Sequence, residues 1–140
     1  MNRIYVDTDV FLNTWFREML KFNPAFYRTE RLLEKVVECT YYLVISNLTL
    51  KELSKKMSLS TNDVKAFYFE KYEQMGKLSV VKVTQPMIDQ ARGVPTHLTD
   101  AVHAVVAKQE NAILVTRNIK DFRRAAKKLG LRVARPEELT

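Results

Sequence analysis

Several carboxylate and amide side chains in this sequence follow short apolar segments, and they are the residues best suited to chemistry. They are Asp7, Glu52, Asp100, Asn118 and Asp121. Carboxylates that lie close together repel one another, and they stay ionised when a cation cancels their charge. A site made only of oxygen ligands suits a hard divalent ion, Mg²⁺ or Mn²⁺. Such an ion activates water for hydrolysis and shields a phosphodiester as negative charge builds on it.

Few soft metal ligands are present. The chain has a single cysteine, Cys39, and two histidines, His97 and His103. Zinc sites are usually built from thiolates and imidazoles, so the composition favours Mg²⁺ or Mn²⁺. One cysteine also excludes an internal disulfide. Because Cys39 lies in an apolar stretch, we expect it to be buried as a small hydrophobic residue.

Apolar segments alternate with helical patterns, and these elements must position the acidic residues. We predict strands at 4–6, 41–45, 78–83 and 112–116, with a fifth, edge strand at 131–133. We predict helices at 10–21, 29–39, 49–57, 60–76, 85–92, 98–109 and 119–129. Strands separated by helices form a mostly parallel sheet covered on both faces. The prediction is one α/β domain over residues 1–140, with three layers around a sheet of four to five strands.

The ends of the predicted strands bring these acids to one edge of the sheet. Asp7 ends the first strand, Glu52 follows the second, and Asp100 begins the helix before the fourth. Ligand sites of open parallel sheets lie beyond the carboxyl ends of the strands, so we expect one shared crevice. Taken singly, each acid has a plainer interpretation, as a turn residue, a helix cap or a solvated side chain.

Positive charge exceeds negative charge in this chain. Its 23 lysines and arginines against 16 acids give a formal net charge of +7, which favours polyanionic partners such as nucleic acid. Eight cations lie between positions 117 and 135: Arg117, Lys120, Arg123, Arg124, Lys127, Lys128, Arg132 and Arg135. They form either a solvated helix face or an RNA contact. No apolar run is long enough to cross a bilayer and no leader pattern is evident, so we expect a cytoplasmic protein.

Four blocks of the sequence resemble those of PIN domains. They are residues 4–12 (IYVDTDVFL), 45–53 (ISNLTLKEL), 98–104 (LTDAVHA) and 114–122 (LVTRNIKDF). The blocks occur in the family's order and span nearly the whole chain. The resemblance implies a PIN-like parallel sheet and Mg²⁺- or Mn²⁺-dependent cleavage of RNA. A free-standing domain of this length is most similar to VapC-type toxins, which usually form dimers and are neutralised by a small antitoxin protein.

Carried over residue by residue, the resemblance implies the composition of the site. Asp7, Glu52 and Asp100 would be the metal-binding, catalytic acids, and the hydroxyls of Ser46 and Thr116 would orient the metal shell.

The fourth acidic position departs from the family pattern. Asn118 stands where the family often has Asp, and an amide oxygen ligates without bringing charge. Asp121, three residues later, is the alternative metal-binding and catalytic residue, and Asp9 is a supporting one. His103 follows Asp100 by three residues; we expect a structural role, with an RNA contact beside Arg117, Lys120, Arg123 and Arg124 as the alternative.

Other functions stay open. Asp7-Thr8-Asp9 imitates the paired aspartates of haloacid-dehalogenase-type phosphatases, in which one Asp is the nucleophile and the other a general acid. That motif requires Thr or Val where this chain has Phe11, which makes it a remote alternative. Asn118 also leaves room for a non-catalytic RNA-binding or scaffold PIN domain. A housekeeping RNA-processing nuclease is a further alternative.

Overall fold

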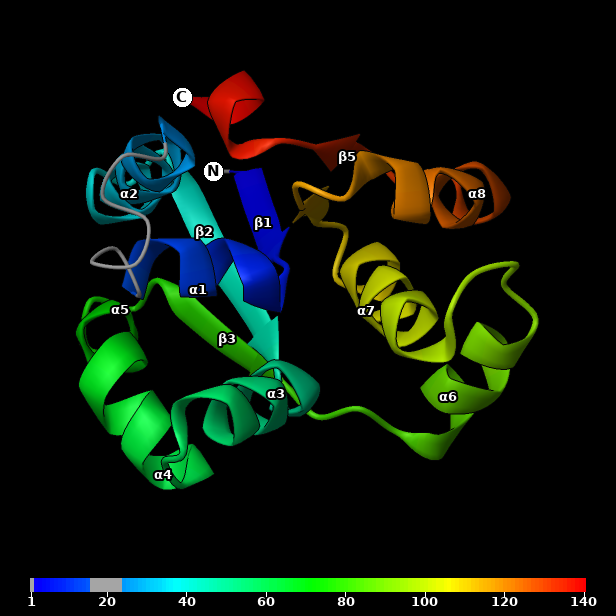
Figure 1. Cartoon of the computed structure of the whole chain (residues 1–140), viewed down its shortest axis with the longest axis horizontal. Coiled ribbons are helices and arrows are strands. Elements are labelled where there is room, and N and C mark those ends of the chain that lie inside the picture. The colour runs from blue at the N-terminus through cyan, green and yellow to red at the C-terminus, as the bar shows by residue number, and fades with distance from the viewer. Residues whose placement is uncertain (1, 16–23) are drawn as a thin grey trace.

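The computed structural model describes residues 2–15 and 24–140 as a parallel five-stranded sheet between two layers of helices (Figure 1). The strands are β1 (Asn2–Val6), β2 (Tyr41–Ser46), β3 (Leu78–Val81), β4 (Ile113–Val115) and β5 (Val133–Ala134). Their order is β3-β2-β1-β4-β5, and every neighbouring pair is parallel. The predicted α/β/α architecture and strand number are therefore confirmed.

The strand order reverses beside β1. The chain adds β2 and β3 on one side of β1 and then returns to add β4 and β5 on the other. Connections leaving the carboxyl ends of β1 and β4 therefore diverge, which is where open sheets form a ligand crevice. The pairing of these two strands continues to their ends, since the Asp7 amide donates to the Val115 carbonyl at 2.9 Å. Asp7 thus lies at the switch point of the sheet.

The helices that cover one face of the sheet come before those of the other face in the sequence. The first face carries α1 (Thr8–Trp15), α2 (Pro24–Val37) and α5 (Glu70–Gln74); the opposite face carries α6 (Gln85–Arg92), α7 (Leu98–Gln109) and α8 (Ile119–Leu129). Side chains of a strand alternate between faces. On β1, Ile4 and Val6 enter the core of the first face, and Tyr5 enters the core of the opposite one.

The structure refines several predicted helix boundaries. The helix α3 (Asn47–Met57) begins two residues before its predicted start, because the Ser46 hydroxyl caps it by accepting from the Thr49 amide. The helix predicted at 60–76 is instead divided into α4 (Thr61–Val64), the π-helical η1 (Lys65–Phe69) and α5. Residues 16–21 of the predicted first helix lie outside the described residues.

Cys39 contradicts the expectation of burial. It is exposed in the turn between α2 and β2, with a left-handed φ of 66°. The apolar pattern around it belongs to the end of α2 and the start of β2, and Cys39 lies in the connection between them.

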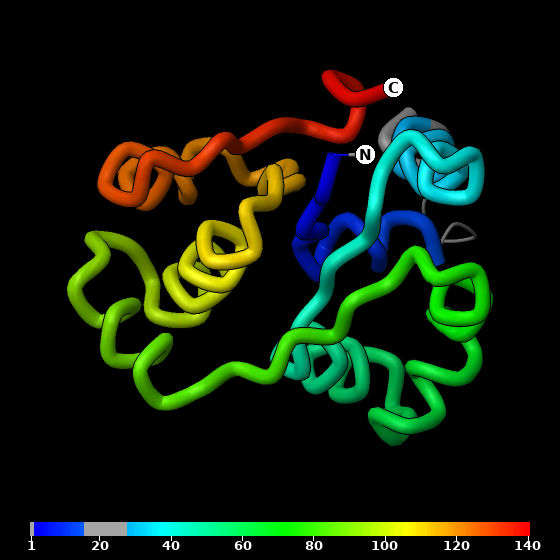
Figure 2. The backbone as a smooth tube through the Cα atoms, turned by 180° about the vertical axis from the view of Figure 1, so that it is seen from behind, coloured from blue at the N-terminus to red at the C-terminus, as the bar shows by residue number. Residues whose placement is uncertain are grey.

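The C-terminal segment packs against α2 and the start of β2 (Figure 2). The 3₁₀ helix η2 (Pro136–Leu139) accepts a hydrogen bond at the Leu139 carbonyl from the Tyr41 hydroxyl, at 2.9 Å. Glu137 pairs with Arg117 at 3.1 Å. Among the described helices, none is long and apolar enough to cross a membrane.

Candidate functional site

Asp7 is a buried carboxylate at the junction of β1 and β4. Only 7% of its surface is exposed. Thr116, directly after β4, donates its hydroxyl to Asp7 Oδ2 at 3.0 Å, and the Asn118 amide donates to that hydroxyl at 3.0 Å. Burial raises the pKa of Asp7 from 3.8 to about 6; His103 and Thr116 counteract this, while Asp9 and Asp100 add to it.

Glu52 lies one and a half turns into α3 and is only partly buried. One of its oxygens, Oε1, accepts two hydrogen bonds: from Thr8 Oγ1 at 2.9 Å and from His103 Nε2 at 2.6 Å. Burial would raise the pKa of this carboxyl. The hydrogen bond and charge of His103, together with Thr8, outweigh burial and lower the pKa of Glu52. Glu52 is therefore held in its ionised form.

A buried chain of hydrogen bonds leads away from Glu52 through His103. The imidazole is 1% exposed, and its Nδ1 lies 2.6 Å from the Tyr5 hydroxyl. That hydroxyl lies 2.7 Å from Ser46 Oγ, the cap of α3. His103 is thus enclosed by protein, and the predicted alternative of a direct RNA contact is not compatible with this burial. Its structural role, which the sequence also suggested, agrees with these contacts.

Asp100 lies in the first turn of α7 and is about half buried. Burial raises its pKa, His103 and His97 lower it, and the charges of Asp121 and Glu52 raise it further. The charge of Asp100 thus interacts with the charges of Asp7, Glu52 and Asp121, which come from three different parts of the fold. The acids therefore lie near enough for their charges to act on one another, and their assembly into one metal site stays a prediction.

Asn118 and Asp121 both remain candidates for the fourth metal-binding position. Asn118 is the exposed N-terminal flanking residue of α8, and its side chain makes no capping hydrogen bond. Asp121 is exposed in the first turn of α8, where its backbone carbonyl accepts from Thr96 Oγ1 at 2.9 Å. Asp9 is exposed in the first turn of α1, and its charge raises the pKa of Asp7.

The donor chemistry of this cluster fits a divalent cation. Within residues 2–15 and 24–140, no three acidic, histidine or cysteine side chains lie close enough to hold a metal ion as they are placed. The charges of neighbouring acids nevertheless add to burial in raising the pKa of Asp7 and Asp100, which is the condition that a cation relieves. Their ligands are oxygens, and both nitrogens of His103 are already hydrogen-bonded. This set suits Mg²⁺ or Mn²⁺.

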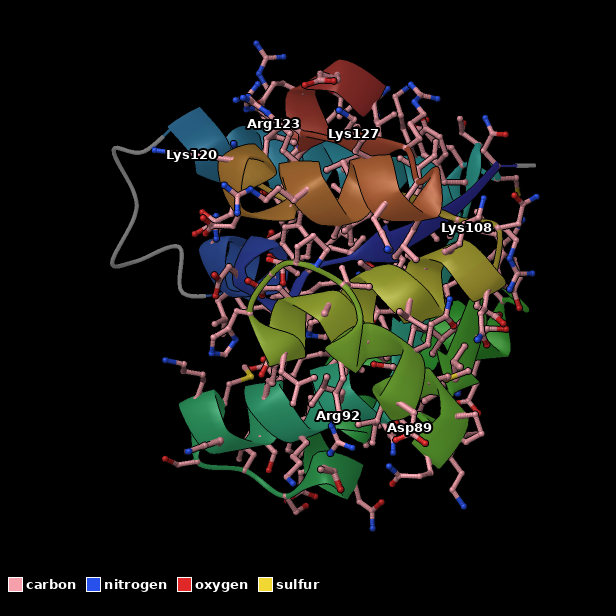
Figure 3. All side chains as sticks on the ribbon, turned by 90° about the vertical axis from the view of Figure 1, so that its right-hand side faces the viewer. Asp89, Arg92, Lys108, Lys120, Arg123 and Lys127 are labelled. Carbon is pink, nitrogen blue, oxygen red and sulfur yellow. The ribbon has the colours of Figure 1, made fainter. Side chains whose placement is uncertain are left out.

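A basic surface extends from the cluster along α8. Its five cations are Lys120, Arg123, Arg124, Lys127 and Lys128, all exposed, while Phe122 and Ala125 on the other side are buried. Figure 3 shows Lys120, Arg123 and Lys127 along the outer side of this helix. In the part of the chain that the structure describes, none of the five lies within ion-pair distance of a carboxylate. Arg117, by contrast, pairs with Glu137.

A comparison with protein families identifies the domain. A model of the PIN domain matches residues 4–128. The chain belongs to the PIN domain family. This match confirms the resemblance of the four sequence blocks. PIN domains are nucleases that generally use divalent metal ions. Membership of this family also removes the phosphatase alternative, which the separation of buried Asp7 from exposed Asp9 disfavours independently.

Solved structures share this PIN fold over nearly the whole chain. FitAB bound to an IR36 DNA fragment has a TM-score of 0.64 at 19% identity, over 98% of this chain and 97% of that chain. VapBC2 from Rickettsia felis, bound to a promoter DNA fragment, has a TM-score of 0.58 at 21% identity, over 95% of this chain and 98% of that chain. A toxin–antitoxin complex from Klebsiella pneumoniae has a TM-score of 0.55 at 19% identity, over 95% of this chain and 97% of that chain. Among curated proteins, none matches the chain.

Two residues beside the acids in this PIN domain were missed by the sequence analysis. Tyr5 has a weak sequence signal, because a phenol inside a short buried strand needs a hydrogen-bond partner. Thr8 has no sequence signal, since threonine is common at the start of a helix. Its bond to Glu52 joins residues 44 positions apart.

Proposed function

We propose that this protein is an Mg²⁺- or Mn²⁺-dependent endoribonuclease, with Asp7, Glu52 and Asp100 as the metal-binding acids. The observation that supports this most directly is Asp7, an acid buried at the switch point with its pKa raised to about 6. Burying a carboxylate there costs stability unless a cation or proton neutralises it. Acids with strongly perturbed pKa values in a crevice are candidates for function.

The bound ion would supply an activated water and would shield the phosphodiester as charge develops. The protein's own residues prepare this chemistry. Thr116 orients the Asp7 carboxylate, and Thr8 with His103 fixes Glu52. Asp100 adds a third carboxylate from α7. Ser46 acts through Tyr5, and the fourth ligand is Asn118 or Asp121, with Asp9 in support.

The basic surface of α8 is the proposed path of the RNA. Lys120, Arg123 and Arg124 are exposed next to the acidic cluster and have no carboxylate partner among the described residues. Phosphate contacts supply most sequence-independent affinity for nucleic acid. Arg117 is the weaker candidate in this group, because Glu137 already engages its guanidinium.

The biological setting of the proposal is a type II toxin–antitoxin system in the cytoplasm. Its support is the shared fold with the Klebsiella pneumoniae toxin–antitoxin complex and with VapBC2. A groove of about 460 Å³ runs between α1, α2 and η1, lined by Trp15, Phe67, Tyr68 and other residues, and Phe67 is 69% exposed. We place a small antitoxin there. A second groove, of about 320 Å³ beside the exposed Leu98, is the proposed contact of a homodimer.

The deciding experiment is cleavage of a mixed single-stranded RNA in EDTA, Mg²⁺ or Mn²⁺. Wild-type protein is expected to cut only with the metal. The rate of Asp7→Asn is expected to fall by about 100-fold or more, because losing even an outer partner of a metal ligand costs roughly 10- to 100-fold. Asp89→Asn is the matched control, because Asp89 is an exposed acid on α6 that pairs with Arg92.

Two outcomes would favour the remaining alternatives. A folded wild type that binds RNA without cutting it in either metal would indicate a non-catalytic RNA-binding PIN domain. Cleavage that does not arrest growth when the protein is expressed would indicate a housekeeping RNA-processing nuclease.

A further inference from the structure

We propose that Tyr5 and His103 position Glu52, anchoring its oxygen Oε1 and leaving Oε2 as the oxygen available to a cation. The inference rests on the proposed function for the presence of that cation. The contacts themselves are properties of this chain. Oε1 accepts from both Thr8 and His103, and within the described residues no hydrogen bond reaches Oε2.

The proton on His103 is fixed by its partner. An ionised carboxylate only accepts hydrogen bonds, so at 2.6 Å the Nε2 atom of His103 must carry the hydrogen and donate it to Glu52 Oε1. A histidine that donates in this way to a metal-binding carboxylate fixes the orientation of that carboxylate.

The other nitrogen of His103 is satisfied from β1. Tyr5 Oη lies 2.6 Å from Nδ1 and 2.7 Å from Ser46 Oγ. A hydroxyl both donates and accepts, so Tyr5 donates to a neutral imidazole, or accepts from a charged one while donating to Ser46. The chain therefore stays fully hydrogen-bonded in either charge state of His103. This matters because His103 and Tyr5 are both buried.

The network also fixes Glu52 relative to the rest of the site. Tyr5 lies on β1 two residues before Asp7, and His103 lies on α7 one turn after Asp100. Ser46 caps α3, the helix that carries Glu52. One set of hydrogen bonds thus links the three elements that carry the three acids. A free glutamate side chain has several rotamers, and holding one of them preorganises the site.

His103 is a positioning residue and neither a ligand nor an acid–base catalyst. Both of its ring nitrogens are engaged within the protein, and its exposed fraction of 1% leaves no access for RNA or water. An alternative in which His103 only fills space predicts that an apolar side chain of similar size replaces it without consequence for Glu52.

The test compares Mn²⁺ affinity in the absence of RNA, measured by calorimetry and electron paramagnetic resonance. We expect His103→Leu to weaken binding by roughly 10- to 100-fold, the range for loss of an outer-shell partner. His103→Gln keeps a donor near Nε2 and should restore part of the affinity. Tyr5→Phe removes only the hydroxyl and should show a smaller loss. Tyr72→Phe is the matched control, since Tyr72 is buried in the core of the first face, across the sheet from Tyr5 and His103.

Two further readouts separate positioning from stability. Ring ¹⁵N resonances should show a protonated Nε2 in His103, and thermal unfolding identifies the variants that remain folded. In RNA cleavage, kcat should fall while KM stays near the wild-type value.

Equal Mn²⁺ affinity in folded wild type, His103→Leu and Tyr5→Phe would overturn the positioning role alone. An Nε2 without a proton would do the same. Wild-type protein that binds Mn²⁺ with the expected variant pattern but cuts no RNA would overturn only the nuclease proposal.

Discussion

Asp7 illustrates how a buried carboxylate opposes stability. Its pKa is about 6 in the folded protein, against 3.8 as its ordinary value, chiefly because of burial. Between these two pH values the folded state holds a proton that the unfolded state has released. Stability therefore falls as pH rises through this window, and above pH 6 the cost is full, on the order of 3 kcal/mol.

Replacing Asp7 by Asn should therefore stabilise the metal-free protein. Asp7→Asn mimics the protonated acid, and its amide oxygen still accepts from Thr116. In EDTA we expect the free energy of unfolding to rise by about 2–3 kcal/mol at pH 8 and by almost nothing at pH 4. Urea unfolding at pH 4, 6 and 8 measures this. A gain that is the same at all three values would show that Asp7 does not titrate as described.

Single residues differ in how well their roles can be predicted. The placement of Asp7 and Asp100 follows from the parallel-sheet rule, because that rule concerns positions along the chain. The contact between His103 and Glu52 spans 51 positions and depends on how α7 packs against α3. No local pattern encodes such a distance. Whether Asn118 or Asp121 completes the site depends in the same way on side-chain placement at the start of α8.

At the level of elements, α6, α7 and α8 have the bounds that the sequence predicted, and α8 shows why. It begins and ends where its pattern indicates, because its buried residues recur with helical spacing and Gly130 ends it in a left-handed conformation, φ 65°. The π-helical η1 was not predictable, since its sequence fits an ordinary helix. The strong separation of charge from apolar residues on α8 also makes its proposed RNA contact testable.

Removing charge from α8 should weaken RNA binding and its dependence on salt. In an Asp7→Asn background with EDTA, the triple variant Lys120→Gln, Arg124→Gln, Lys127→Gln should bind single-stranded RNA more weakly. Each lost phosphate contact reduces the slope of log affinity against log salt by about 0.7, so the slope should decrease by about 2. Fluorescence anisotropy over a salt series measures both quantities.

The control removes the same charge from other elements. Lys55, Lys71 and Lys82 are exposed on α3, on α5 and after β3, and their triple glutamine variant should keep most of the slope. An equal loss in both triples would mean that net charge, and no particular surface, attracts RNA.

At the scale of the whole molecule, the two proposed interfaces use different parts of the structure. The groove beside Phe67 is built from α1, α2 and η1, while the groove beside Leu98 is built from α3, α6 and α7. These helices lie on opposite sides of the sheet in Figure 1 apart from α3, which lies near its carboxyl edge. An antitoxin and a second copy could therefore bind at the same time.

Light scattering of the protein, alone and mixed with a candidate antitoxin, tests both interfaces. We expect about twice the chain mass of 16.3 kDa for the protein alone. Phe67→Glu should abolish the complex and leave the dimer, because it places an unpaired charge in the first groove. Leu98→Lys should abolish the dimer and leave the complex. A monomeric wild type, or a complex that tolerates Phe67→Glu, would contradict the respective interface.

The exposed position of Cys39 has a practical bearing on such measurements. A lone thiol at a surface turn is accessible to the thiol of another molecule, so air oxidation joins two chains covalently at the amino-terminal end of β2. This crosslinked species has the mass of the expected dimer but a different geometry. Cys39→Ser is therefore the appropriate background for determining the assembly state. In the protein that keeps Cys39, the same thiol offers a single attachment point for a spectroscopic label, at the end of the sheet opposite the acids.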